Sequence, residues 1–188
     1  MDYTSSERER FEELFRAHHG AVRAYVYRRA DKGEVDDVVA DVFLVAWRRR
    51  ATMPDDPLPW LLGVARNTLG TKRRAETRRL RLIERAKSAA ASERVSSVDV
   101  DCESQLARLA LARLNANDRE AITLIAWEGL TPGQAAVALG IPPNRFRVRL
   151  HRAVRRLRWA MEFASDEIPD ADLHPRAVHP PSSQGALS

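Results

Sequence analysis

The chain has 188 residues, a formal net charge of +5 at pH 7 and 44% hydrophobic residues. This composition excludes a wholly disordered chain, and no apolar run approaches the roughly 20 residues of a membrane-spanning helix. The polar start of the chain, which contains Glu7 and Glu9, is unlike a secretory signal, so we expect a cytoplasmic protein without stable membrane insertion. Cys102 is the single cysteine, which leaves no internal disulfide and no cysteine metal site, and no metal or cofactor is expected.

Charge is sorted along the sequence. Residues 31–41 hold five acids and one lysine, residues 66–81 hold seven basic residues and one glutamate, and residues 141–160 hold seven arginines and no acid. A helix that only has to stay soluble mixes both signs, so the two basic blocks favour two surfaces for a polyanion. The acidic block favours a surface for a different, basic partner. The plainer alternative for all three blocks is a set of solvated helix faces.

Helical periodicity dominates the first half of the chain. The pattern predicts a pair of helices within residues 6–30, a turn at 31–33 and a helix over 35–50. In this last helix the apolar residues recur at i, i+3, i+4 and i+7, which predicts one buried stripe with acids on the opposite side. A loop with three prolines over 51–59 ends it, and the next helix is expected over about 60–82. The stripe consists of Val35, Val38, Val39, Val42, Phe43, Ala46 and Trp47.

The periodicity fades after this helix and returns later. Residues 82–103 are rich in alanine and serine and are interpreted as a flexible linker. A second helical domain is predicted over 104–163, and residues 164–188 are interpreted as a disordered tail. The fold class is therefore all-α, with two small helical domains (6–81 and 104–163) joined by a flexible linker.

The second domain contains a helix-turn-helix pattern. One of its helices is expected to begin after Asn117, as the N-cap, with Glu120 as the capping-box partner. Thr131 can cap a short helix that starts at Pro132 and ends at Gly140, and a long basic helix follows over 144–161. A short helix, a glycine turn and a basic helix form a helix-turn-helix, in which the second helix lies in the major groove of DNA.

The long basic helix has two faces. Phe146, Leu150, Ala153 or Val154, and Leu157 are expected to point inward, and the basic residues lie opposite. The major groove admits one helix, and the arginine fork matches both guanine and phosphate oxygens. The residues predicted to reach base edges are Arg147, Val148, His151 and Arg152, and those predicted to hold phosphates are Arg145, Arg149 and Arg155. The alternative is an ordinary amphipathic helix with a solvated basic face.

Three segments, taken together, resemble the sigma-70 family, and specifically its small extracytoplasmic-function type, over about residues 9–163. Residues 34–47 (EVDDVVADVFLVAW) resemble the polymerase-binding helix of the family. Residues 59–67 (PWLLGVARN), followed by Arg73 and Arg74, resemble its promoter-melting and −10 helix. Residues 106–158 are similar to its −35-binding domain.

The resemblance implies a sigma factor that directs core RNA polymerase to specific promoters and helps to open the DNA, with no enzymatic activity of its own. Its implied partners are core RNA polymerase, promoter DNA and an anti-sigma factor. Residues at the polymerase-binding positions are Asp36, Asp37, Ala40, Asp41 and Leu44. Residues at the −10 positions are Arg66, Asn67, Lys72, Arg73 and Arg74.

The chain departs from the family pattern at several places. Ala40 stands where the family usually has glutamine, so one polar contact to the polymerase is expected to be absent. Residues 142–144 (PPN) replace the usual start of the recognition helix, although Asn144 can cap it. Phe146 is larger than the usual β-branched residue. Trp60 could stack on a base, but its spacing with Val64 favours a place in the core.

Two other classes of protein, a dimeric DNA-binding regulator and an enzyme, are the alternatives to a sigma factor. A helix-turn-helix regulator that binds duplex DNA as a dimer, without polymerase, would leave the acidic helix over 35–47 unexplained. A nuclease or other enzyme would need a phosphate loop or a metal cluster, and the sequence shows neither. The histidines are scattered, at positions 18, 19, 151, 174 and 179.

Overall fold

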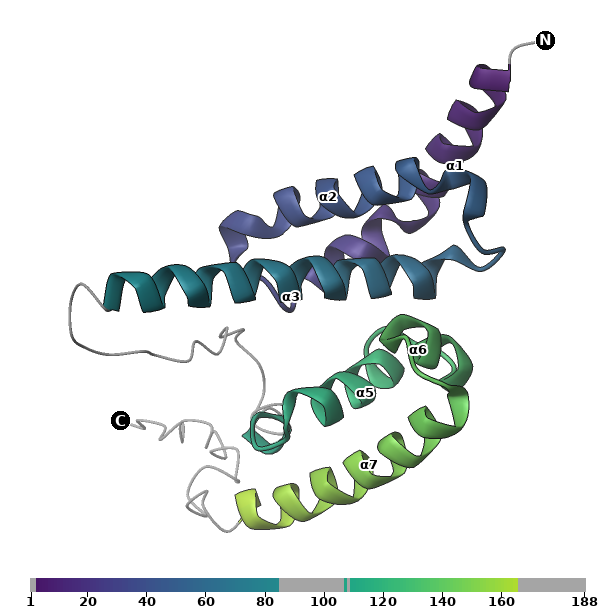
Figure 1. The fold of residues 1–188 in the computed structure, drawn as a ribbon. Coiled ribbons are helices and arrows are strands. Elements are labelled where there is room, and N and C mark those ends of the chain that lie inside the picture. Colours follow the sequence, from purple (N-terminus) through teal and green to yellow (C-terminus); the bar gives the residue numbers. More distant parts are fainter. Residues whose placement is uncertain (1–2, 85–106, 108, 166–188) are drawn as a thin grey trace, which may run out of the picture.

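The computed structural model describes residues 3–84, 107 and 109–165, and these residues form helices and turns without a strand. The first half consists of α1 (Tyr3–Tyr27), α2 (Val35–Arg48) and α3 (Pro57–Glu84), with short 3-10 turns at Lys32–Glu34 and Arg50–Thr52. The second half consists of α5 (Ala116–Ala126), α6 (Pro132–Leu139) and α7 (Pro143–Ser165), preceded by a short helical stretch over 109–112. Figure 1 shows the two halves one above the other.

α1 is one continuous helix, so the predicted pair of helices within residues 6–30 is wrong. No proline or turn residue interrupts the stretch, and Gly20 lies inside the helix with open space around it. The apolar stripe of α1 becomes more buried toward its end: Phe15 is 39% exposed, whereas Val22, Tyr25 and Val26 are completely buried. The end of α1 is therefore the part that belongs to the core.

α2 follows its prediction closely. Six of the seven stripe residues are buried, Trp47 is half-buried, and the acids of the opposite face are exposed. The helix ends at Arg48, two residues before the predicted end. A 3-10 turn and an extended Met53 then lead to α3.

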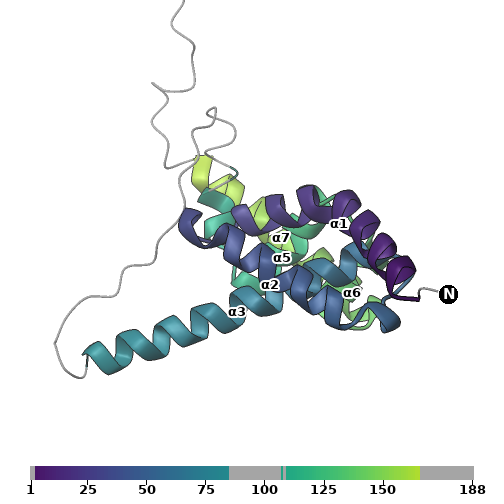
Figure 2. The same ribbon diagram turned by 90° about the horizontal axis from the view of Figure 1, so that it is seen from above.

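α3 is longer at both ends than predicted. It begins at Pro57, because prolines are tolerated in the first helical turn, where no backbone N–H is needed. It continues to Glu84, so the first three residues of the predicted linker are helical. Its second half projects beyond the other helices, as Figure 2 shows. Residues 85–106, including Cys102, and residues 166–188 lie outside the described residues, and so do most of the predicted linker and tail.

The helix-turn-helix forms as predicted. Thr131 and Gln134 make a complete capping box at α6, and Gly140 ends this helix in the left-handed conformation with φ of +64°. α7 begins at Pro143, and Phe146 and Ala153 are buried while Val154 is 41% exposed, so Ala153 is the inward residue of the two alternatives. The predicted cap of α5 is wrong: Asn115, not Asn117, is the N-cap, and its side chain accepts a hydrogen bond from the Asp118 N–H.

The two halves share one apolar core, which the sequence reading did not anticipate. The core runs from the α1–α3 bundle into the second half, where Ala135, Ala136 and Phe146 belong to the same cluster as Leu61 and Leu62. α6 lies directly on α3, with the backbone of Ala138 close to Gly63. Leu62 of α3 is buried and belongs to the same cluster as Ala135 and Leu139 of α6. Among the described residues, no helix is long and apolar enough to cross a membrane.

Candidate nucleic-acid and polymerase interfaces

The outer face of α2 exposes all five residues predicted to bind polymerase. Positions 36, 37, 40, 41 and 44 share one side of a helix, and every one of these side chains is exposed. Leu44 is an apolar residue among acids, 46% exposed. Asp36 lies 3.5 Å from Arg23, and Asp41 lies 3.7 Å from Lys72. Exposed pairs of this kind are weak, so the acids remain available to a basic partner.

The residues predicted to contact the −10 box lie on α3 but have different surroundings. Asn67, Arg73 and Arg74 are exposed, whereas Arg66 and Lys72 are half-buried. Arg74 donates to the Thr71 hydroxyl at 3.1 Å. Arg73 donates to the carbonyl of Arg29, just past the end of α1, which is a place where a basic side chain satisfies a helix-terminal carbonyl. Arg73 therefore has a structural role besides the predicted one.

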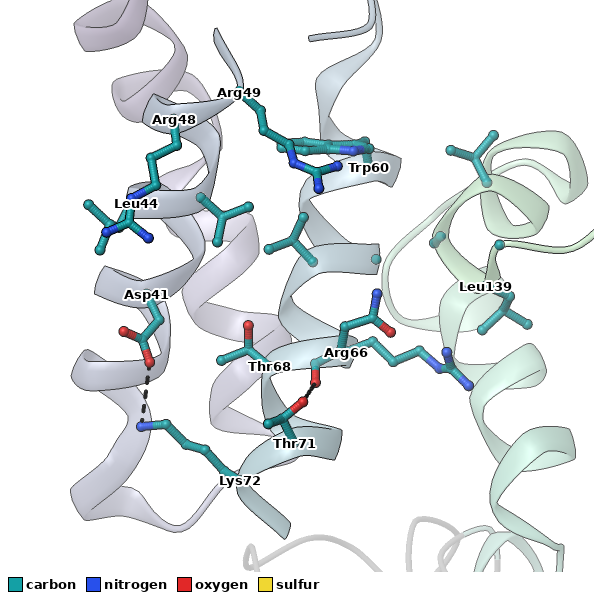
Figure 3. Close-up of a pocket in the computed structure, with 17 residues that line it drawn as sticks. Asp41, Leu44, Arg48, Arg49, Trp60, Arg66, Thr68, Thr71, Lys72 and Leu139 are labelled. Atoms are coloured by element: carbon teal, nitrogen blue, oxygen red, sulfur yellow. Dashed lines mark hydrogen bonds and ion pairs between the residues drawn. The ribbon is translucent and has the colours of Figure 1, made fainter. Parts of the chain in front are cut away.

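A groove of about 580 Å³ lies between α2, α3 and α6. Figure 3 shows its lining, with Asp41 and Lys72 paired on one side and Leu139 on the other. The Arg66 side chain extends from α3 toward Leu139. The groove therefore joins residues predicted for polymerase binding and for the −10 box, and the end of α6 forms its opposite wall. Its further lining residues are Leu44, Val45, Arg48, Arg49, Trp60, Gly63, Val64, Asn67, Thr68, Thr71, Val137, Ala138 and Gly140.

The predicted DNA face of α7 is open to solvent. All seven of its residues are exposed except Arg149, which is half-buried. Asn144 accepts a hydrogen bond from the Arg145 N–H at 2.8 Å and so orders the start of the helix. In the part of the chain that the structure describes, Arg156 is the α7 arginine that pairs with an acid, Asp118. Among these described residues no ion pair neutralises the arginines of the predicted DNA face, and such a positive surface attracts a polyanion.

Two residues that support this domain were missed by the sequence reading. Asp118 is buried, accepts from Asn115 and pairs with Arg156 of α7. Arg119 donates to the carbonyls of Leu111, Ala112 and Leu114 at 2.8–3.0 Å, which holds the helical stretch before α5 against it. A buried carboxylate such as Asp118 needs partners, and its pair with Arg156, 38 positions away, leaves no local signal in the sequence.

A second missed cluster joins the two halves of the chain. The Tyr25 hydroxyl donates to Glu120 at 2.7 Å. Arg29 donates to Glu120 at 3.0 Å, to Glu128 at 3.0 Å and to Thr123 at 2.9 Å, and its guanidinium lies 3.7 Å from the Tyr25 ring centroid. Arg28 also pairs with Glu128. We call these six residues the latch: Tyr25, Arg28, Arg29, Glu120, Thr123 and Glu128.

Burial and charge set the protonation states within the latch. Burial raises the pKa of Tyr25 well above its ordinary value of 10.0, and the negative charge of Glu120 raises it further, so the hydroxyl stays protonated and donates. Burial lowers the pKa of Arg29, but Tyr25 and Glu120 outweigh that effect and the pKa is raised. Arg29 is therefore a fixed cation, and each of its three side-chain nitrogens donates to a residue of the second half, while Nη1 also donates to the Tyr25 carbonyl.

Among the described residues, no group of three or more His, Cys, Asp or Glu side chains is placed to hold a metal ion. His151 lies on the exposed face of α7, and His19 stacks on Phe43 with the ring centroids 6.1 Å apart. His174 and His179 lie outside the described residues.

Comparisons with known proteins converge on one family. The family model for sigma-70 region 2 matches residues 14–79, and the one for sigma-70 region 4 matches residues 104–157. The ECF RNA polymerase sigma factor SigL of Mycobacterium tuberculosis is 31% identical over 157 residues, which cover 79% of this chain and 87% of SigL. The RNA polymerase sigma factor CnrH of Cupriavidus metallidurans is 30% identical over 165 residues, covering 80% of this chain and 86% of CnrH.

Solved structures show the same fold. CnrH in complex with the cytosolic domain of CnrY aligns with a TM-score of 0.55 and 26% identity over 83% of this chain and 90% of CnrH. The sigma factor RpoE of Bartonella quintana, in complex with the anti-sigma factor NepR, aligns with a TM-score of 0.62 and 24% identity over 82% of this chain and 98% of RpoE.

Proposed function

The chain belongs to the sigma-70 family and is of its extracytoplasmic-function type, and we propose on this premise how its exposed surfaces divide the work of initiation. It directs RNA polymerase to promoters. The observation that carries the division is that one chain exposes an acidic face on α2 and basic faces on α3 and α7, each on a different helix. The acidic face suits a basic protein partner, and the two basic faces suit two stretches of DNA.

The α2 face is proposed to bind core RNA polymerase. Asp36, Asp37 and Asp41 would meet a basic surface, and the exposed Leu44 and Ala40 would pack at its centre. Complementary charge in such an interface sets orientation and association rate more than affinity. A leucine that is exposed among acids is what an interface of this kind requires.

The α7 face is proposed to read the −35 box in duplex DNA. Arg147, Val148, His151 and Arg152 would reach base edges near the start of the helix, and Arg145, Arg149 and Arg155 would hold phosphates. The α3 face is proposed to capture the opened −10 strand. There Asn67 offers a donor and an acceptor to a flipped base, while Arg66, Lys72, Arg73 and Arg74 follow the backbone.

The chain is proposed to work by binding alone, without catalysis and without a cofactor, in the cytoplasm where polymerase and DNA are found. The domain limits proposed for this division are 6–81 and 104–163. A protein partner is also proposed. Because the relative CnrH forms a complex with the cytosolic domain of CnrY, we propose that an anti-sigma factor binds this chain as well.

In vitro transcription with core RNA polymerase tests the function directly. The purified chain is added to core polymerase on genomic fragments, and transcripts are mapped to their start sites. We expect initiation at discrete sites that share sequence boxes near −10 and −35. The absence of any chain-dependent transcript, together with no association between the chain and core polymerase, would overturn the proposal.

The α2 face has its own test in the same assay. Asp37→Arg reverses a charge on an exposed side chain, so we expect the fold to persist while co-purification with core polymerase falls. Glu9→Arg makes the same change on the exposed part of α1 and serves as the matched control. Equal co-purification of the two variants would move the polymerase interface away from α2.

A further inference from the structure

Arg156 of α7 is an exposed arginine that the sequence reading left out of the DNA face. Arg145, Arg149, Arg152 and Arg156 stand at i, i+4, i+7 and i+11 of the same helix. Side chains with this spacing lie within a sector of about 60° around the helix axis. Because Arg145 and Arg149 are proposed to hold phosphates, Arg156 continues the phosphate-holding side of α7 by one turn.

The length of this row of arginines suits one strand of duplex DNA. From Arg145 to Arg156 the helix rises by about 16 Å, since each residue adds about 1.5 Å. Base pairs follow one another at about 3.4 Å along the duplex, so the row matches about five successive phosphates. The Arg156 side chain is 56% exposed, which leaves it accessible to such a partner.

Arg156 also has an anchor on its protein side. Its Nη1 donates to Oδ2 of Asp118, whose side chain is only 7% exposed. Asp118 Oδ2 also accepts from Asn115 Nδ2 at 2.9 Å, and the Asp118 N–H donates to Asn115 Oδ1 at 3.0 Å. Asp118 stands in the first turn of α5, where the helix dipole favours a negative charge. The carboxylate is therefore held in place before any partner of Arg156 arrives.

This ion pair is a weak way to hold α7 on α5. Removing two charges from water costs much of what their attraction returns. Apolar packing already joins the two helices, which lie side by side in Figure 1. Ala153 is buried in a cluster with Leu114 and Ile122, and Leu157 packs against it. What the pair adds to this packing is a fixed direction for the Arg156 guanidinium.

We propose that Arg156 is a further phosphate-binding residue of the −35 face and that the buried Asp118 is its positioning residue. The inference rests on the proposed function of α7, because it extends that same face. A guanidinium carries N–H donors on more than one edge, so one edge can bind Asp118 while another binds a phosphate oxygen. An arginine that is ordered in advance loses less side-chain freedom on binding, which strengthens its contact with DNA.

A double variant that leaves the net charge unchanged tests the phosphate contact. Asp118→Asn/Arg156→Met removes one negative and one positive charge, so no unpaired charge is left behind in the domain. Methionine is an unbranched, good helix former, so we expect α7 to fold. Arg8→Met/Glu12→Gln is the matched control, because it removes an exposed ion pair of 3.1 Å from α1 in the same way.

The measurement is the binding of the full chain to a DNA duplex of about 20 base pairs and arbitrary sequence, at several salt concentrations. One phosphate contact contributes about 0.9 to the slope of log K against log salt concentration. Between about 50 and 200 mM salt, the affinity of the double variant should therefore fall about 3.5-fold less than that of the wild type. The control should match the wild type. Equal slopes for the double variant and the wild type would overturn the phosphate contact.

Asp118→Asn alone tests the positioning role, because simple electrostatics predicts the opposite sign. Loss of a negative charge near DNA would by itself strengthen binding. We expect binding about threefold weaker than in the wild type, since Arg156 must then be ordered during binding. In an Arg156→Met background the same change should not weaken binding, because Asp118 acts through Arg156. Binding at least as tight as in the wild type, or an equal loss in both backgrounds, would overturn the positioning role.

Phosphate ethylation interference locates the contact on a promoter. The full chain and core polymerase are bound to a promoter mapped by in vitro transcription, and the wild type should show interference at a phosphate beside the −35 box where the double variant shows none. Identical interference patterns would place Arg156 outside the interface. The salt titrations need neither polymerase nor a promoter, so a failure of the proposed function would leave their outcome intact.

Discussion

A single buried hydroxyl shows how the latch depends on protonation. Tyr25 is completely buried, and its hydroxyl donates to Glu120. Burial and the negative charge of Glu120 both raise the pKa of Tyr25. The phenol therefore stays neutral and keeps the proton that it donates to the Glu120 carboxylate. No sequence pattern could have assigned this role, because the two residues are 95 positions apart.

The pH dependence of stability follows from that shift. A group whose pKa is raised on folding contributes stability that is complete below its unfolded value, here 10.0, and is lost as the pH rises above it. We therefore expect the free energy of unfolding to fall above pH 10, by at most about 1.4 kcal/mol per pH unit from this group. Urea unfolding between pH 8 and pH 11, from about two units below to about one unit above the ordinary tyrosine pKa, measures this fall. Tyr25→Phe should flatten this part of the profile, and an identical slope in the variant would contradict the assignment.

The arginines of α7 are predicted to divide between base and phosphate contacts. Arg147→Ala and Arg152→Ala should each weaken binding to a cognate promoter duplex by about 1–3 kcal/mol and relax the preference at one base position. Arg155→Ala is the matched comparison on the same face, and it should weaken binding to all sequences alike and lower the salt dependence by about one ion. Footprinting and titrations at several salt concentrations separate the two outcomes. Loss of affinity without loss of sequence preference in all three variants would assign the whole face to phosphates.

At the scale of elements, local chemistry explains which predictions succeeded. The Thr131 cap of α6, the glycine that ends this helix and the stripe of α2 are all short-range patterns, and all three formed as predicted. The prediction of two helices within residues 6–30 failed because a single glycine, Gly20, lies inside α1 without breaking it. The cap of α5 moved to Asn115 because that residue, rather than Asn117, has the extended backbone that an N-cap needs. The interface between α3 and α6 could not be foreseen, since its pairs are long-range.

Two glycines of the helix-turn-helix, Gly140 and Gly133, are predicted to change the free energy of unfolding in opposite directions when each is replaced by alanine. Gly140 has φ of +64°, so Gly140→Ala places a Cβ in a left-handed conformation and should lower the free energy of unfolding by about 1–2 kcal/mol. Gly133→Ala lies within α6, where a Cβ meets nothing closer than 4.0 Å, and should raise it by up to about 1 kcal/mol. Urea unfolding of both variants measures the difference. Stabilisation by both would mean that the turn relaxes to another conformation.

At the scale of the whole molecule, the candidate surfaces were accessible to sequence reasoning but their mutual arrangement was not. Charge blocks, periodicity and the family resemblance placed the residues predicted to bind polymerase and DNA on α2, α3 and α7, and these residues are exposed except for half-buried Arg66, Lys72 and Arg149. Periodicity reports only that a helix has an apolar face. It does not say which neighbour covers a second face, as α6 does at Leu62.

A shared core has a thermodynamic signature. One apolar cluster spans both halves, and a smaller one around Leu111, Leu114, Ile122 and Ala153 lies in the second half alone. Small helical domains have thin cores, so each half gains stability from the other. Groups that share a core tend to unfold together, and we expect the wild-type chain to unfold in one calorimetric transition whose van't Hoff and calorimetric enthalpies agree.

Gly63→Gln should divide that transition, because it removes the contribution of α6 to the first half while both halves remain folded. Two overlapping transitions, or a van't Hoff enthalpy well below the calorimetric one, are the expected result, and Gly20→Gln should keep the single transition. Since each half then stands alone, the half with the thinner core melts at a lower temperature than the intact chain. Two separate transitions already present in the wild type would mean that the common cluster contributes too little to couple the halves, which would then be held together by the latch alone.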